Sequence, residues 1–210
     1  MTAKIRSHVG DLPDLSNYQA PRLNAVAIDT ETLGLIPHRD RLCVVQLSPG
    51  DGTVDVVQIR KGQTSAPNLE TLITDPAITK LFHFGRFDIA VLDHAFGALS
   101  TPVYCTKIAS KLTRTYTDRH GLKDLCKELL DLDLSKQQQS SDWAAESLSK
   151  AQLEYAASDV LHLHDLMEKL EHRLQREDRK SIAQDCFAFL PTRARLDLAG
   201  WPEQDIFAHS

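Results

Sequence analysis

Three short apolar runs stand close together in the first third of the chain, at residues 25–28, 42–48 and 53–59. The first run ends in a polar Asp29, which indicates a buried strand with acids at its carboxyl end. The sequence Pro-Gly-Asp-Gly at residues 49–52 is typical of a tight turn between the second and third runs. Links this short predict that the three strands form an antiparallel meander.

The pattern changes after residue 60 to an alternation of short apolar runs and helical segments. We predict helices at 68–75, 86–97, 106–115 and 121–131, and short strands at 79–84 and 102–105. Strands that alternate with helices are typical of a parallel arrangement, whereas the first three strands are antiparallel. The sequence therefore predicts an α/β fold with a mixed five- to six-stranded sheet flanked by helices.

The segment near 150–173 has the clearest helical pattern in the chain. Ser149 and Gln152 fit a capping box at its start. An apolar stripe at three- and four-residue spacing follows, made of Leu153, Ala156, Val160, Leu163, Met167 and Leu170. Tyr155 and Asp159 are four residues apart and therefore project from the same face of the predicted helix.

The length of 210 residues predicts one domain with an appendage. Residues 1–21 contain two prolines and little periodicity, and we interpret them as an N-terminal arm. We expect the domain at 22–175 and a C-terminal extension at 176–210. Trp201, Ile206 and Phe207 in the extension have two possible partners, the body of the domain or a second copy of the chain, so a homodimer is one prediction.

Composition excludes several classes of protein. With 42% hydrophobic residues the chain is an ordinary globular one, and no apolar run is long enough to span a membrane. The N-terminal residues lack an apolar signal core, so the expected location is the cytoplasm. The four cysteines form no CxxC pair, which argues against structural zinc and for reduced, buried thiols.

Four acids in three separate segments are the candidate metal ligands: Asp29, Glu31, Asp88 and Asp159. Each also has an ordinary explanation, as an exposed strand end, a helix N-terminal acid or a solvated acid beside a helix core. Carboxylate oxygens suit Mg²⁺ or Mn²⁺, and a pair of such ions is a known device for in-line attack on a phosphodiester.

Taken together, these segments resemble the tyrosine subtype of the DEDD superfamily of 3′→5′ exonucleases. Asp29-Thr-Glu31 after an apolar strand matches the first motif, and Asp88 in His-Phe-Gly-Arg-Phe-Asp matches the second. Tyr155 and Asp159 match the third motif, Y-x-x-x-D. The resemblance is closest to ribonuclease D, covers roughly residues 22–170 and extends through residues 136–143 and 152–160.

This resemblance implies a ribonuclease H-like fold and two divalent ions about 4 Å apart. It implies that Asp29 bridges the ions, that Glu31 and Asp159 complete one of them, and that Asp88 acts on the other largely through water. Tyr155 would orient the attacking water, since a phenol is a poor base at neutral pH. The product would be a nucleoside 5′-monophosphate, released from the 3′ end of RNA, possibly of tRNA precursors.

Two departures from the family pattern are visible. Family members often have Asp-Thr where this chain has Cys105-Thr106. That acid is not one of the four metal ligands, so only local support of the site is affected. Larger ribonuclease D proteins also carry helical HRDC domains after the nuclease, and only about 40 residues follow the region of resemblance here.

The sequence indicates the residues that contact the substrate less clearly than it indicates the metal-ligating acids. The predicted contacts are Thr30, His83, Phe87, Lys107, Lys111, Arg114 and Lys136. Lys107, Lys111 and Arg114 share one face of a predicted helix, which is either a track for phosphates or an ordinary solvated face. The net charge of −5 argues mildly against nucleic acid, but two divalent ions would cancel the formal −4 of the site.

Two other functions stay open. Proofreading domains and Werner-type exonucleases share the tyrosine subtype and act on DNA, and the catalytic acids do not distinguish RNA from DNA. The absence of an attached polymerase or helicase favours RNA. A catalytically dead nucleic-acid-binding scaffold is the other alternative. Such a protein should have lost a metal ligand, and all four acids and Tyr155 are present.

Overall fold

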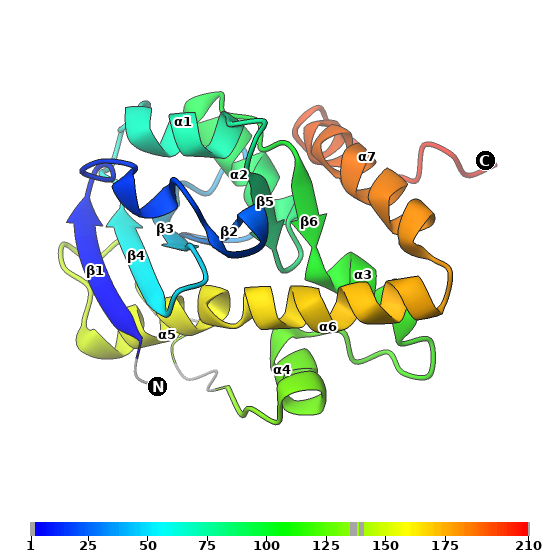
Figure 1. The fold of residues 1–210 in the computed structure, drawn as a ribbon. Coiled ribbons are helices and arrows are strands. Elements are labelled where there is room, and N and C mark those ends of the chain that lie inside the picture. The colour runs from blue at the N-terminus through cyan, green and yellow to red at the C-terminus, as the bar shows by residue number, and fades with distance from the viewer. Residues whose placement is uncertain (1–2, 135–137, 139–140, 210) are drawn as a thin grey trace.

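The computed structural model describes residues 3–134, 138 and 141–209. In this part of the chain six strands form one sheet in the order β1-β4-β3-β2-β5-β6 (Figure 1). The strands are β1 Lys4–Val9, β2 Ala25–Thr32, β3 Leu42–Ser48, β4 Thr53–Gln58, β5 Thr79–Phe82 and β6 Val103–Cys105. The mixed sheet predicted from the sequence is therefore confirmed.

Strand directions follow from the lengths of the links between strands. β2, β3 and β4 are antiparallel neighbours, as the short links and the turn at 49–52 predict. β5 and β6 run parallel to β2 and are reached through helices. β1 was not predicted from the sequence; it lies inside the expected N-terminal arm and pairs in parallel with β4.

A buried carboxylate fastens β1 to the sheet. Asp55 of β4 accepts hydrogen bonds from both ends of the Arg6 guanidinium and from the Tyr18 hydroxyl, and it also contacts His8 at 2.7 Å. Asp55 is buried, and these partners supply the compensation that a buried charge requires. Arg6 and His8 are polar residues in a strand, so the hydrophobic pattern alone does not reveal β1.

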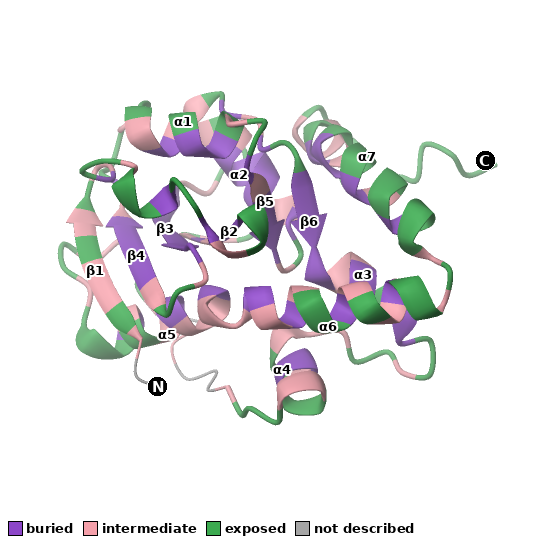
Figure 2. Cartoon of the chain, viewed as in Figure 1, coloured by how far each residue is buried: buried purple, intermediate pink, exposed green. Residues whose placement is uncertain are grey.

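Helices cover both faces of the sheet. They are α1 Pro67–Thr74, α2 Arg86–Phe96, α3 Thr106–Thr113, α4 Leu122–Leu130, α5 Lys150–Leu161, α6 Leu163–Arg176 and α7 Lys180–Leu198. α5 packs on β2, β3 and β4, and α6 continues along β2 and β5. α1 and α2 lie on the opposite side of the sheet in Figure 1. Strands β2 to β6 are mostly buried between these layers, whereas β1 at the edge of the sheet has no buried residue (Figure 2).

The prediction of one helix near 150–173 is wrong in one respect, because this segment forms two helices. α5 starts with the predicted capping box between Ser149 and Gln152. α5 ends at Leu161 and α6 begins at Leu163. His162 lies between them with φ −104° and ψ 2°, which is not a helical conformation. The apolar residues keep the same spacing on both sides of this break, so the hydrophobic periodicity of the sequence does not reveal it.

Much of the C-terminal extension is a helix that packs on the body. α7 contacts α2, β6 and α3. Arg86 at the start of α2 pairs with Asp197 at 2.6 Å and also donates to the carbonyl of Pro202. The last residues beyond α7 expose Trp201, Ile206 and Phe207. Among the described residues, no helix is both long and apolar enough to cross a membrane.

Candidate active site

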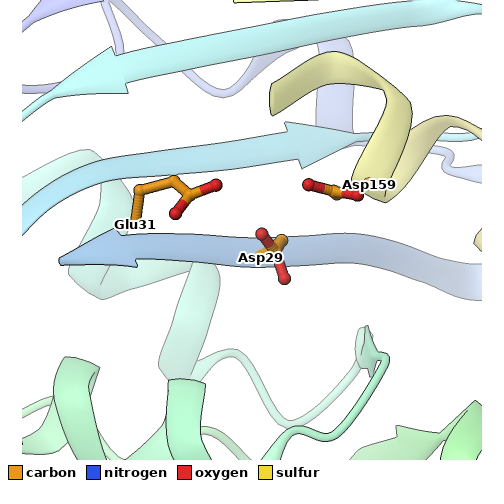
Figure 3. A group of neighbouring side chains, drawn as sticks. All are labelled: Asp29, Glu31 and Asp159. Atoms are coloured by element: carbon orange, nitrogen blue, oxygen red, sulfur yellow. The ribbon is translucent and has the colours of Figure 1, made fainter. Parts of the chain in front are cut away.

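Three carboxylates meet between β2 and α5. Asp29 and Glu31 are two residues apart on β2 and therefore project from the same face of the sheet. Asp159 projects from α5, which covers that face. One oxygen from each of these three side chains lies within 4.8 Å of the others (Figure 3). Segments 130 residues apart in the sequence thus form one acidic cluster.

Asp88 approaches the same strand from α2. β2 pairs with β5 only from Ala25 to Ala27, so the β5-facing edge of β2 is free where the acids begin. Asp88 is 4% exposed, and its carboxylate accepts a hydrogen bond from the Thr30 hydroxyl at 2.7 Å. The fourth acid therefore stands beside the cluster of three and is held by a residue of the first motif.

A compact turn joins β5 to α2 and sets the position of Asp88. Phe84 has φ +69°, which is an outlier for a bulky residue. A Cβ on Gly85 would lie 2.7 Å from the Cβ of Phe82, so only glycine fits there without a shift of its neighbour. After this turn of three residues, α2 starts at Arg86, two residues before Asp88.

The four acids raise one another's pKa values. Burial is the largest cause for Asp29, followed by the charges of Asp88, Asp159 and Glu31, and its pKa is raised well above the ordinary value. Burial and neighbouring carboxylates raise the pKa of Glu31 to about 8 and that of Asp159 to about 7. Burial raises the pKa of Asp88 to about 7 despite its hydrogen bond from Thr30. Four acids held this close are unfavourable unless positive charge is added.

The donor set fits a hard divalent cation. All four candidate ligands are carboxylates, and carboxylate oxygens are what Mg²⁺ and Mn²⁺ prefer. Asp29, Glu31 and Asp159 present their oxygens close enough to share one ion. Such an ion would neutralise the repulsion that raises the pKa values of these groups.

Tyr155 borders the acids on α5, one helical turn before Asp159. It is partly buried, and the ring of Trp143 packs against it with 6.0 Å between ring centroids. Burial and the nearby charges of Asp159, Glu31 and Asp29 raise the pKa of the Tyr155 phenol. The hydroxyl therefore stays protonated at neutral pH, which suits positioning of a water rather than proton abstraction.

Replacement of Tyr155 by phenylalanine tests that assignment. We expect Tyr155→Phe to lower kcat by about 10²-fold, the scale on which loss of correct positioning acts. Metal affinity should stay within about twofold, because the four carboxylates are intact. Single-turnover rates and a calorimetric Mg²⁺ titration measure the two quantities. Equal loss of rate and of metal affinity would contradict a positioning role.

A cleft of about 330 Å³ opens beside the acids. It is lined by Asp29, Thr30, Glu31, His83, Phe84, Lys107, Gly121, Leu122, Lys123, Leu134, Tyr155 and Asp159. The Lys107 ammonium lies 4.3 Å from the centre of the Phe84 ring. His83 contacts the Thr106 hydroxyl through Nδ1 at 2.8 Å, and burial lowers the pKa of His83 to about 3. The cleft thus offers an aromatic face, cations and a neutral imidazole next to the carboxylates.

The structure brings some of the predicted substrate contacts together. Thr30, His83 and Lys107 line the cleft. Lys111 lies in an adjacent groove that Phe84 and Lys107 also line. Lys136 lies outside the described residues.

Arg114 and Phe87 are placed elsewhere. Arg114 is 1% exposed, and its guanidinium binds Glu128, the Ser110 hydroxyl and the carbonyl of Arg119. These internal partners leave no surface for a phosphate, so Arg114 does not continue the basic face of α3. Phe87 packs against the core rather than lining the cleft.

Phe84 lies outside the core, although the apolar character of its side chain favours burial. Its side chain is 45% exposed at the mouth of the cleft. Gly121, Leu122 and Lys123 at the start of α4 were also not predicted as lining residues. The sequence His-Phe-Gly contains the only local signal, because a glycine after an aromatic residue is typical of a turn. Such a turn is where an aromatic side chain can remain exposed.

Comparison with protein families gives a match over most of the chain. The model of a 3′-5′ exonuclease family matches residues 13–175. Among curated relatives, ribonuclease D of Gluconacetobacter diazotrophicus is 36% identical over 154 residues, which is 73% of this chain and 39% of the relative. Ribonuclease D of Granulibacter bethesdensis is 34% identical over 82% of this chain and 44% of its own length. The chain thus spans less than half of these relatives.

Solved structures include much more similar chains. Brucella melitensis NrnC with bound Mg²⁺ has 68% sequence identity, a TM-score of 0.94 and coverage of 99% of this chain and 100% of NrnC. NrnC bound to pGG has 69% identity, a TM-score of 0.95 and the same coverage. Escherichia coli RNase D has 25% identity and a TM-score of 0.76 over 93% of this chain and 51% of its own.

Proposed function

The chain belongs to the 3′-5′ exonuclease family, and from this premise we propose that it is a metal-dependent 3′→5′ exoribonuclease. It would hydrolyse phosphodiesters from the 3′ end of RNA and release nucleoside 5′-monophosphates. The observation that carries the proposal is the meeting of Asp29, Glu31 and Asp159, with Asp88 and Tyr155 beside them, at the edge of an open cleft. A scaffold without activity would have no need to keep this unfavourable cluster of acids.

RNA is the substrate that the relatives favour. Several ribonuclease D proteins match the chain, and a structure of the 69% identical NrnC contains pGG. We infer that very short RNA fragments are substrates as well as the 3′ ends of longer RNA such as tRNA precursors. DNA, the alternative, has no comparable support among these relatives.

The metal would be held by the four carboxylates, with Asp29, Glu31 and Asp159 around one Mg²⁺ and Asp88 serving a second. Mn²⁺ suits the same oxygen ligands. When bound, such ions supply the positive charge that stabilises the charge developing on the phosphodiester and lower the pKa of water. The NrnC structure with Mg²⁺ supports this choice of metal.

The protein's own groups would position the reactants. Tyr155 would hold the attacking water through its protonated hydroxyl. Phe84 would stack on a base, since base–aromatic stacking tolerates every base. Lys107 and Lys111 would meet phosphates through their ammonium groups, and Thr30 would keep the Asp88 carboxylate in place through its hydrogen bond.

The direct test is digestion of matched RNA and DNA oligonucleotides with free 3′ ends. Each is labelled at its 5′ end, so that shortening from the 3′ end gives a ladder, and the products are separated by chromatography. We expect mononucleotide release from RNA in Mg²⁺ and none in excess EDTA. Faster digestion of the DNA would replace the proposal by a deoxyribonuclease, and no digestion of either would reject the exonuclease.

The lysines of α3 provide a second test. We expect Lys107→Ala combined with Lys111→Ala to raise the KM for RNA several-fold, because two cations beside the cleft are lost. The slope of log affinity against log salt should become shallower by about 0.7 for each phosphate contact removed. Lys169→Ala, an exposed lysine on α6, is the control for loss of charge alone. An unchanged salt slope would assign both lysines to an ordinary solvated face.

Self-association through the C-terminal tail is the remaining part of the proposal. Phe207 is 76% exposed, and Trp201 and Ile206 are also exposed. Apolar side chains gathered at one end of a chain are typical of an interface. Light scattering of the full chain measures whether a homodimer forms.

A further inference from the structure

Gln46 lies in the middle of β3, and its side-chain amide makes no hydrogen bond that would explain why it is buried there. The residue is 0% exposed. In the described part of the chain neither its amide nitrogen nor its amide oxygen has a hydrogen-bond partner. Buried polar groups in native proteins are almost always paired, so a glutamine with both ends unpaired needs an explanation.

The register of the sheet places Gln46 directly opposite Asp29. β2 and β3 are antiparallel, and Asp29 and Gln46 are paired residues. Directly opposite residues project from the same face, with Cβ atoms about 5 Å apart. That face is the one that α5 covers and from which Asp159 meets Asp29. The unpaired amide therefore belongs to the residue directly across from Asp29, within reach of its carboxylate after a side-chain rotation.

Asp29 also lacks a donor. Asp88 accepts a hydrogen bond from Thr30, whereas no described residue donates one to the Asp29 carboxylate. An unpaired donor and an unpaired acceptor thus stand opposite each other on one face.

Two other neutral polar residues on this face have partners. Gln58 of β4 donates its amide to the carbonyl of Ala145, and the Ser48 hydroxyl of β3 donates to the carbonyl of Thr53. Neutral polar side chains on this face can thus be paired, which makes the unpaired amide of Gln46 worth explaining.

We propose that Gln46 is a positioning residue for the metal-bound state: when a divalent cation is held by Asp29, the Gln46 amide N–H turns to donate to the Asp29 carboxylate and fixes its orientation, whereas in the metal-free protein the amide stays unpaired. The inference rests on the proposed function, since it concerns the same metal site. A metal-binding carboxylate is commonly held in this way by a hydrogen-bond donor behind it. A neutral amide suits the position, because a lysine or arginine there would repel the cation.

The test uses two apolar replacements of similar length, Gln46→Leu and Gln46→Met. Mg²⁺ alone is titrated calorimetrically into the metal-free full chain, and thermal unfolding is recorded in EDTA. We expect Mg²⁺ affinity to fall about 10- to 100-fold, the usual effect of removing such a partner. The Tm in EDTA should be unchanged or higher, since an unpaired buried amide has been replaced by an apolar group. At saturating Mg²⁺ the KM for RNA should be unchanged.

Ser48→Ala is the matched control, because Ser48 is a buried polar residue on the same strand and the same face, two residues from Gln46. It should lower the Tm and leave Mg²⁺ affinity alone. The proposal is overturned if both Gln46 variants bind Mg²⁺ like the wild type, or if their Tm in EDTA falls together with the affinity. Failure of the wild type itself to bind Mg²⁺ would instead reject the proposed function.

Discussion

Replacement of Asp29 by asparagine should reduce RNA hydrolysis by about 10³-fold or more, the scale of several kcal/mol of lost charge stabilisation. Asp29 is central because its carboxylate lies with those of Glu31 and Asp159 and interacts with the charge of Asp88. Asparagine keeps the shape of the side chain but removes the negative charge that a divalent cation needs. Mg²⁺ binding should be lost together with activity.

The same substitution should leave the metal-free protein at least as stable as the wild type at neutral pH. One of four mutually repelling acids is gone, so the repulsion between the others is reduced. Initial rates of mononucleotide release, Mg²⁺ calorimetry and thermal unfolding in EDTA give the three quantities. Asp118→Asn, at an exposed surface position, is the control. If the activity of Asp29→Asn is within tenfold of the wild type, Asp29 is not a ligand of the catalytic metal.

Stabilisation by Mg²⁺ should depend strongly on pH. The pKa of Glu31 is raised to about 8, and the pKa values of Asp88 and Asp159 are raised to about 7. Between about pH 4 and pH 8 the folded metal-free protein therefore retains protons that the unfolded chain has released. The free energy of unfolding contributed by these groups falls as the pH rises through that window and levels off above it.

Mg²⁺ binds the deprotonated carboxylates, so it competes with protons at low pH and is unopposed at high pH. At a concentration about 100 times its Kd it should stabilise the protein by about 2.7 kcal/mol. For a chain of this size that corresponds to about 5–10 °C in Tm. We expect this upshift at pH 8 and an upshift below about 2 °C at pH 5.

Differential scanning fluorimetry with and without Mg²⁺ at both pH values measures the upshift. Groups far from the site titrate alike in both samples, so the difference reports the acidic cluster. Asp29→Asn should show no upshift at either pH. An upshift of equal size at pH 5 and pH 8 in the wild type would contradict the raised pKa values.

The order and directions of the central strands were predictable because local patterns determine them. The apolar runs at 42–48 and 53–59 and the turn between them lie within a few residues of each other. β1 was not predictable in this way. Its residues are largely polar, and the partners that hold Arg6 and His8 lie on β4, about 50 residues away. The break at His162 was also hidden, because the apolar spacing is the same on both sides of it.

The acids of the site were predictable because their roles are carried by residue type and spacing. The substrate contacts were less so. The spacing that predicted a basic face for Arg114 contains no information about Glu128, which binds Arg114 from the next helix. The exposure of Phe84 follows from a left-handed backbone in a three-residue turn. The hydrophobicity of Phe84 argues for burial, so its position was decided by geometry that a sequence pattern does not contain.

The contact between Arg86 and Asp197 bears on how the molecule unfolds. Arg86 stands two residues before Asp88, so the helix that carries one of the four candidate metal ligands is clamped by the last helix of the chain. The family match ends at residue 175, whereas this clamp is made at residue 197. The match to the family model therefore ends before the residue of α7 that holds Arg86. α7 should melt in one transition with the nuclease rather than fray as a separate appendage.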